Sequence, residues 1–347
     1  TVTAGGYIKR TALADFRAQK RGGKGLQGMS TKDEDVVTTL FVANTHTQLL
    51  FFTTDGMAYK IKTWRLPLGG RTAKGKAIVN ILPIPAGVSV AAIMPVDREE
   101  AEWGDLQIVF ATTQGDVRRN RLSDFTNVRS NGKIAMKLPE GVELVNARIC
   151  SEDDDVMLTT NSGRAIRFAS TDLRVMNSRA STGVRGIRLN GDDMVVSMSV
   201  IRHFEATPEE RAAYLKMRRA MAGLTDEEAG EDDVPADPNF SQERYEEMAA
   251  VENLILTITR GGSGKLSSSH DYPVRGRGGM GVAAMDKAMR GGPVVASFPV
   301  ELVDQIMLVT STGQSIRCPI DGISFRSRNA GGVRVFNTSR DEQVVSV

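Results

Sequence analysis

The sequence predicts an all-β fold, a propeller-like ring of six blades that carries a small helical insert. A short apolar run, a Thr/Gly turn and a basic strand recur six times in the 347 residues. A glycine-rich basic stretch follows each copy, and the runs between copies are rich in Val, Ile, Thr and Phe, which is typical of strands. A fixed period of this length dictates the architecture. Radial repetition of about four strands per unit leaves only short sheet edges.

The repeat divides a single domain, residues 1–347, into six approximate units. Its turn glycines stand 50, 59, 48, 99 and 51 residues apart, at Gly6, Gly56, Gly115, Gly163, Gly262 and Gly313. The longest gap contains an insert of a different kind. We expect the units to span residues 1–35, 36–87, 88–141, 142–192, 193–291 and 292–347.

The two ends of the chain predict how the ring closes. The first unit lacks the β-rich run that precedes each later hairpin, and the chain ends on an extra run at residues 343–347. We therefore expect this terminal strand to pair with the first unit.

The insert, residues 205–250, is helical and acidic. Thr207 is a good N-cap, Pro208 suits the first turn, and the Glu residues that follow favour a helix start. An apolar stripe follows (Ala213, Met217, Ala220, Met221 and Leu224), and a second helix is expected from about residue 241 to 250. The insert holds 13 acidic and 5 basic residues, a net charge of −8, so the remaining 29 acidic and 39 basic residues give a net charge of +10. It acts either as a counter-charge that competes with an anionic ligand or as inert decoration.

Composition argues against a membrane protein and against catalysis in this chain. No apolar run reaches membrane-spanning length, and the start is neither an initiator Met nor a signal peptide, so we expect a soluble fragment of a longer protein. Its two cysteines lie in apolar, strand-like runs, which favours reduced thiols. The three histidines, His46, His203 and His270, have neither metal-ligand spacing nor a paired nucleophile.

Seven residues near the start, QKRGGKG at 19–25, combine three cations with three glycines. Glycines allow backbone N–H groups to approach an anion closely, so this turn suits phosphate. For such a run alone, the alternative is a solvated basic loop. The residues are Gln19, Lys20, Arg21, Gly22, Gly23, Lys24 and Gly25.

This run, early in a six-fold repeat, resembles the box that marks the C-terminal domain of the A subunit of bacterial DNA gyrase, a type IIA topoisomerase. The resemblance covers essentially the whole chain. Lys20 stands where the commonest box has Arg, and the helical insert departs from the simplest version of the family. The related subunit of topoisomerase IV lacks an intact box, so the box favours gyrase.

The resemblance implies a β-pinwheel, in which blades exchange strands with their neighbours and duplex DNA wraps around the outer rim. The parent gyrase would then introduce negative supercoils, with the box required and ATP hydrolysed by the partner subunit. The expected partners are double-stranded DNA, the rest of the gyrase A subunit and the gyrase B subunit in a heterotetramer, with no membrane, in the bacterial cytoplasm near the nucleoid. No cofactor is expected for this chain, and ATP and Mg²⁺ only for the holoenzyme.

One basic stretch per unit predicts phosphate contacts at successive points of a curved path. For each single residue the alternative is an ordinary solvated cation. The expected rim contacts are Lys60, Arg65, Arg71, Lys74, Lys76, Arg118, Arg119, Arg129, Lys133, Arg167, Arg179, Arg185, Lys265, Arg275, Arg277, Arg317, Arg326 and Arg328.

Two other functions are compatible with a propeller. A protein-interaction ring is the main alternative, although rings of the WD type carry Trp-Asp dipeptides and this sequence has none. A propeller enzyme would need a convergent carboxylate or histidine site, which the sequence does not show.

Overall fold

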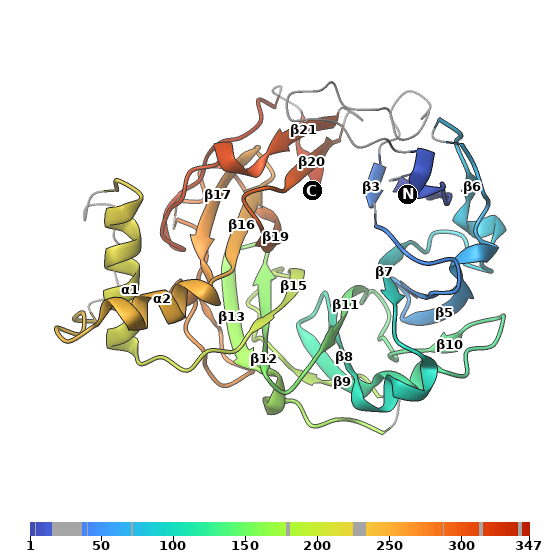
Figure 1. Cartoon of the computed structure of the whole chain (residues 1–347), viewed down its shortest axis with the longest axis horizontal. Coiled ribbons are helices and arrows are strands. Elements are labelled where there is room, and N and C mark those ends of the chain that lie inside the picture. Colours follow the sequence, from blue (N-terminus) through green and yellow to red (C-terminus); the bar gives the residue numbers. More distant parts are fainter. Residues whose placement is uncertain are drawn as a thin grey trace.

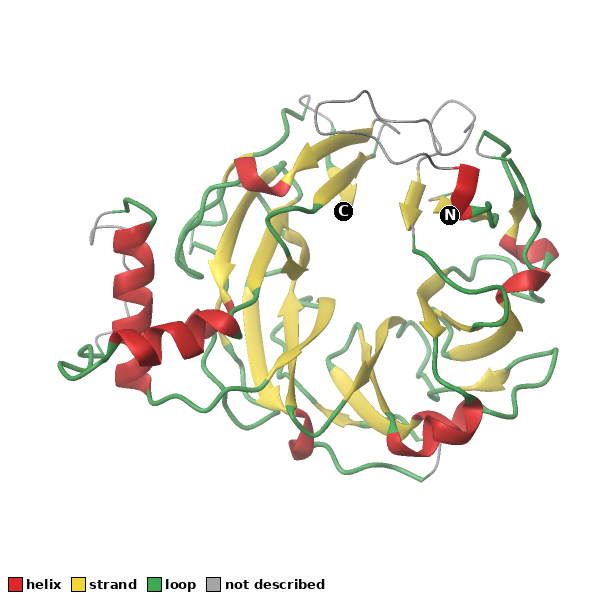
Figure 2. Ribbon diagram, in the orientation of Figure 1, coloured by secondary structure: helices red, strands yellow, loops and turns green. Residues whose placement is uncertain are grey.

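The computed structural model describes residues 1–3, 5–15, 37–39, 41–70, 72–177, 181–224, 234–286, 288–311, 315–338 and 342–347. In this part of the chain, six antiparallel sheets stand in sequence order around a central axis (Figures 1 and 2). This arrangement confirms the all-β, propeller-like fold.

The strands of each sheet pair with their neighbours in the following order. The first sheet contains β3 (Val37–Thr39), β1 (Val2–Thr3), β2 (Tyr7–Ile8) and β6 (Lys76–Ala77). The second sheet contains β10 (Lys133–Ile134), β5 (Met57–Lys62), β4 (Gln48–Thr53) and β7 (Val90–Val96). The third sheet contains β11 (Leu144–Cys150), β8 (Gln107–Thr112), β9 (Asp116–Arg121) and β14 (Val184–Arg185). The fourth sheet contains β15 (Val195–Arg202), β12 (Asp154–Thr160), β13 (Arg164–Ala169) and β18 (Val282–Ala283). The fifth sheet contains β19 (Val294–Val300), β16 (Leu254–Thr259), β17 (Ser263–Ser268) and β22 (Val333–Arg334). The sixth sheet contains β21 (Ser315–Pro319), β20 (Gln305–Thr310) and β23 (Val344–Ser346).

Neighbouring units exchange a short strand. The hairpin β4–β5, for example, is completed on its outer side by β10, which comes from the following unit. The strands β6, β14, β18 and β22 join the preceding sheet in the same way. This exchange makes the ring a β-pinwheel, as the resemblance implied.

The inner strand of each sheet comes after its hairpin in the chain. In Figure 1, β7, β11, β15 and β19 lie towards the middle of the ring, and each pairs with the first strand of the hairpin before it. The strand expected to open each unit therefore completes the preceding sheet instead.

The expected docking of the terminal strand on the first unit was wrong. β23 pairs with β20 of the sixth unit, with Val344 opposite Thr310. The first unit already has its inner strand, because β3 pairs with β1. The run at the end of the chain is thus the ordinary inner strand of the last blade.

The recurrent Thr/Gly turn has a local physical cause. The last threonine of the first hairpin strand is buried, and in several units its hydroxyl bonds the backbone of the turn, as Thr112 Oγ1 does in accepting from Asp116 N at 3.2 Å. The glycine that follows has a positive φ, for example +84° at Gly115, which L-residues with a side chain rarely adopt.

The core lies between consecutive sheets and not inside one of them. Phe52 of β4, Phe110 of β8 and Phe125 form an edge-to-face trio with ring centroids 5.3 to 5.8 Å apart. Comparable apolar layers join each further pair of neighbouring sheets from the first to the sixth. From the first to the sixth, consecutive blades are therefore held together mainly by these layers between them.

The insert forms α1 (Pro208–Met221) and α2 (Gln242–Ala250), which lie outside the ring in Figure 1. The expected N-terminal signal is a complete capping box between Thr207 and Glu210. The apolar stripe was partly wrong: Ala213 is buried, but Met221 is 62% exposed. The helix docks instead through Tyr214, which stacks on Tyr245 with centroids 4.9 Å apart.

Short 3-10 helices occupy many of the connections. They span Leu13–Asp15, Thr63–Arg65, Ile78–Asn80, Glu100–Asp105, Leu122–Phe125, Ser170–Asp172, Ser269–Asp271 and Ile320–Gly322.

Candidate nucleic-acid interface

Part of the predicted site lies outside the described residues. This applies to the whole box, Gln19 to Gly25, to Arg71 and Arg179, and to the side chain of Arg317. The remaining predicted cations fall into two groups that differ in burial.

The first group is buried. Arg118, Arg119, Arg167, Lys265 and Arg328 are each at most 5% exposed, and the side chain of Lys60 is 13% exposed. Five of the six lie on the second hairpin strand of a blade. There, a cation faces the segment that brings in the exchanged strand from the next unit.

Lys265 shows the arrangement most completely. Its Nζ donates to the carbonyl oxygens of Ser327 at 3.0 Å, of Ala330 at 2.7 Å and of Arg328, all in the segment that leads to β22. Burial lowers the pKa of Lys265 to about 7, while the carboxylates of Asp271 and Asp286 oppose the shift. The side chain fastens the sixth unit to the fifth.

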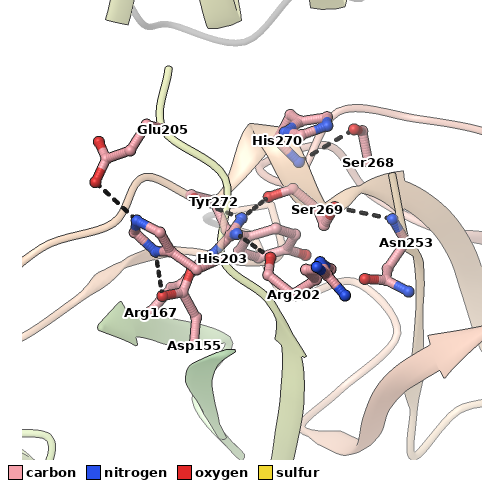
Figure 3. A network of polar contacts seen from close by, with 10 residues as sticks. All are labelled: Asp155, Arg167, Arg202, His203, Glu205, Asn253, Ser268, Ser269, His270 and Tyr272. Carbon is pink, nitrogen blue, oxygen red and sulfur yellow. Dashed lines mark hydrogen bonds and ion pairs between the residues drawn. The ribbon is translucent and has the colours of Figure 1, made fainter. Parts of the chain in front are cut away.

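Arg167 does the same between the fourth and fifth units (Figure 3). Its guanidinium pairs with buried Asp155 at 2.7 Å and donates to the carbonyl oxygen of Ser269 at 2.7 Å. Burial lowers the pKa of Arg167, and the ion pair with Asp155 opposes this.

His203 extends this network towards the insert. Its two ring nitrogens lie 2.7 Å from a carboxylate oxygen of Asp155 and 2.8 Å from one of Glu205. Burial lowers the pKa of His203, but the hydrogen bonds and charges of Glu205 and Asp155 outweigh it, so the pKa is raised.

The other buried cations act similarly. Arg118 donates to the carbonyl oxygen of Ser181 at 2.9 Å, and Lys60 donates to that of Thr126 while pairing with Glu100 at 2.7 Å. Arg328 reaches back to the carbonyl oxygens of Asp271 and Ala283, both at 2.8 Å. Arg119 instead bonds Gln107 within its own hairpin, at 2.9 Å.

This burial corrects the expectation that Arg118, Arg119, Arg167, Lys265 and Arg328 contact DNA from the rim. Each of the five donates to a carbonyl or side-chain oxygen inside the protein, and a phosphate cannot approach a group that is hardly exposed. For Lys60, whose side chain keeps 13% of its surface exposed, the rim contact stays a prediction. We call Lys60, Arg118, Arg167, Lys265 and Arg328 the clamp cations, because each joins two units.

The second group is accessible. Arg65, Lys76, Arg129, Arg185, Arg275 and Arg277 are exposed, and Lys74, Lys133 and Arg326 are half-buried. All nine lie in the segments between the second hairpin strand and the exchanged strand, or in the exchanged strand itself. We call them the perimeter cations.

Contacts within this group orient some of its members. Arg277 donates to the carbonyl oxygens of Arg185 at 3.0 Å and Asp172 at 3.2 Å, which brings the basic segments of the fourth and fifth units together. Lys74 lies over the ring of Tyr7 at 3.8 Å, and Lys133 donates to two carbonyl oxygens of its own loop. Each of these segments therefore presents positive charge in a defined place.

Sequence reasoning missed two sets of residues. Lys9 is a further clamp cation, because its Nζ donates to the carbonyl oxygen of Gly70 at 3.0 Å and the residue is 1% exposed. Its position, three residues after the turn glycine, matches Arg118 and Lys265 and could have revealed it. The basic residues of α1 were missed because the insert was treated as uniformly acidic.

The described residues contain neither a cluster of metal-ligating side chains nor a helix that could span a membrane. There, no three His, Cys, Asp or Glu side chains come together as a metal site would require. Burial raises the pKa of the Cys150 thiol to about 12, which suits an inert core cysteine. No helix in that part of the chain has the length and apolarity needed to span a membrane.

Comparison with protein families gives one match over nearly the whole chain. The family described as "DNA gyrase C-terminal domain, beta-propeller" matches at residues 1–44, 47–97, 107–151, 154–202, 253–298 and 304–347. These six segments each contain one hairpin and all or most of the inner strand that follows it.

Curated relatives and solved structures agree with this match. The A subunit of DNA gyrase from Granulibacter bethesdensis is 47% identical and that from Rickettsia bellii 44% identical, each over 100% of this chain and 38% of the relative. The chain thus spans well under half the length of these relatives.

Two solved structures share the fold. A DNA gyrase A C-terminal domain superposes with a TM-score of 0.67 and 21% identity, over 99% of this chain and 96% of the other. A C-terminal domain of DNA topoisomerase IV gives a TM-score of 0.72 and 20% identity, over 99% and 90%.

Proposed function

Because this chain belongs to the DNA gyrase C-terminal domain family, we propose that it binds duplex DNA and wraps it around the perimeter of the ring. The observation that carries the proposal is the recurrence of perimeter cations on the second to the sixth units, in structurally equivalent segments. Charges repeated around a disc meet phosphates at successive points of a curved path. A single basic loop cannot do this.

The physical need for several contacts follows from the stiffness of DNA. Smoothly bending 20–30 base pairs by 40–90° costs of order 1–6 kcal/mol. Distributed phosphate contacts offset this cost, because each adds favourable counterion release. Wrapping by this chain would let the parent gyrase introduce negative supercoils, with ATP and Mg²⁺ used by the holoenzyme and ATP hydrolysed by the B subunit.

The partners follow from the same proposal. They are double-stranded DNA, the remainder of the gyrase A subunit and the gyrase B subunit in a heterotetramer, in the bacterial cytoplasm at the nucleoid. The chain itself contributes binding and bending, while DNA cleavage belongs to the rest of the assembly.

The salt dependence of binding tests the proposal. Neutralising about 6–10 phosphates predicts a loss of roughly a thousand- to a hundred-thousand-fold in affinity between about 50 and 200 mM salt. Fluorescence anisotropy with a labelled duplex of random sequence measures it. Affinity that hardly changes with salt would contradict binding through the perimeter.

The box has a separate expected role, anchoring one end of the DNA path. Replacing Lys20, Arg21 and Lys24 with Ala should reduce wrapping by the chain and supercoiling by the reconstituted gyrase far more than DNA affinity. The matched control is Arg275→Gln/Arg277→Gln, which should lower the affinity. Equal losses in all three assays would reduce the box to one more basic patch.

A further inference from the structure

A cleft of about 600 Å³ lies where α1 meets the turn after β17. Its walls carry four cations, Arg211, Lys216 and Arg219 of α1 and Arg275 of the body, but one carboxylate, Asp271. The apolar part of the lining comes from Leu215, Pro273 and Val274 among others.

The four cations have no acceptor in the described part of the chain. None of their side chains makes a hydrogen bond or ion pair there, and the Nε of Arg219 is buried without a partner. The Asp271 carboxylate, by contrast, accepts from the backbone N–H of Arg328 at 2.7 Å. Burial and the nearby charges of Arg167 and Arg275 lower the pKa of Arg211, while the carboxylates of Glu209 and Glu205 oppose the shift.

The two helices of the insert carry opposite net charges, and the insert's net charge of −8 comes from eight acidic residues outside them. α1 contains four basic and two acidic residues, a net charge of +2, whereas α2 contains one basic and three acidic residues, a net charge of −2. The basic helix lines the cleft. An overall acidic insert therefore presents a positive surface to the body of the ring.

The contacts of α1 with the body fix the cleft in shape. Tyr214, which is fully buried, meets the ring of His270 edge-on at 4.9 Å, and His270 Nε2 lies 2.8 Å from the carbonyl oxygen of Met248. On another side of the helix, Arg218 pairs with Glu252 at 3.2 Å and lies over the ring of Phe325.

The cleft continues the surface of the perimeter cations. Arg275 belongs to both, and Arg277, two residues later, joins the segment that carries Arg185. In Figure 1, α1 stands outside the ring on the side of β13 and β17. A duplex that contacts Arg275 on the perimeter of the fifth unit therefore reaches a residue of the cleft wall.

We propose that the cleft binds backbone phosphates of the wrapped duplex, so that the insert lengthens the DNA path. This rests on the proposed function and gives the insert a third role, different from the competing counter-charge and the inert decoration that the sequence left open. DNA is favoured over an acidic protein segment because the cations are continuous with the perimeter cations of neighbouring units.

The test is the salt dependence of DNA binding by the double variant Arg211→Gln/Arg219→Gln of the 347-residue chain. The control is Arg148→Gln/Arg202→Gln, which removes the same charge from exposed positions on the inner strands β11 and β15. Each phosphate contact contributes about 0.9 to the slope of log K against log salt. The slope of the cleft variant should therefore be smaller in magnitude by about 2 than that of the unaltered chain. The slope of the control variant should equal that of the unaltered chain.

Two further measurements make the result unambiguous. Thermal unfolding of the cleft variant should match that of the unaltered chain, and Arg211→Lys/Arg219→Lys should recover most of the slope. A folded Gln variant with an unchanged slope would overturn the proposal and favour an acidic protein as the occupant. If the unaltered chain itself lacked salt-dependent binding, the proposed function would fail before the cleft was tested.

Discussion

At the scale of the residue, the same type of side chain performs two tasks that sequence cannot separate. Lys265 and Arg275 both belong to the basic stretches of the fifth unit, yet Lys265 is fully buried and Arg275 is exposed. The difference depends on carbonyl groups of the next unit, more than 60 residues away at Ser327. A long-range contact of this kind leaves no local signal, so the recurrence of cations was predicted while their burial was not.

This distinction predicts opposite effects of two substitutions. Lys265→Met removes the ammonium group that donates to three carbonyl oxygens of the next unit, and it should lower the free energy of unfolding by about 2 kcal/mol or more. Arg275→Gln should change it by less than about 0.5 kcal/mol but should weaken DNA binding. Urea unfolding and anisotropy measure the two. Loss of DNA affinity in Lys265→Met without loss of stability would show that its amine contacts DNA.

His203 predicts a pH dependence of stability. Its folded pKa is raised, so its contribution is fully present below the unfolded value of about 6.5 and fades as the pH rises through the folded value. The melting temperature of the unaltered chain should therefore fall from pH 6 to pH 8 by more than that of His203→Asn, which cannot be protonated. His270 and Lys265 titrate in both proteins, so their contributions cancel in the difference between the two pH profiles. Parallel profiles would refute the bridge between Asp155 and Glu205.

At the scale of the element, the sequence predicted the hairpins but not the order in which strands complete a sheet. The hairpin has a local signature, Thr, Gly and alternating apolar residues. The inner strands have none that tells which neighbour they join, so the run at Val344 was assigned to the first unit although it pairs with Thr310. The exchanged strands are only two residues long, as in β18, which is too short for a periodic pattern.

Strand exchange makes one glycine particularly sensitive. A Cβ on Gly281, which precedes β18 and has a φ of +68°, would lie 2.2 Å from the carbonyl oxygen of Ala165 on β13. At Gly191, also with a positive φ, a Cβ would meet nothing within 4 Å. Gly281→Ala should thus cost about 1–3 kcal/mol more than Gly191→Ala, measured by urea unfolding. Equal costs would mean that β18 is not held tightly against β13.

At the scale of the whole molecule, the second to the sixth blades present the perimeter cations, while the clamp cations and apolar layers hold neighbouring blades together. The family resemblance and the repeat were enough to predict this architecture. They did not predict that the insert would place the basic helix α1 beside the perimeter, because the insert's net charge of −8, which comes from residues outside its helices, hides the positive charge of α1. The proposed path of DNA follows from this distribution of charge.

The linking number of closed DNA tests the central claim, that the ring bends DNA around its perimeter, most directly. Nicked circular DNA is sealed by ligase in the presence of the 347-residue chain, and its topoisomers are separated after the protein is removed. Wrapping predicts a shift in the mean linking number that grows with the amount of bound chain and shrinks in Arg275→Gln/Arg277→Gln. An unchanged distribution under conditions in which the circle is fully bound would contradict wrapping.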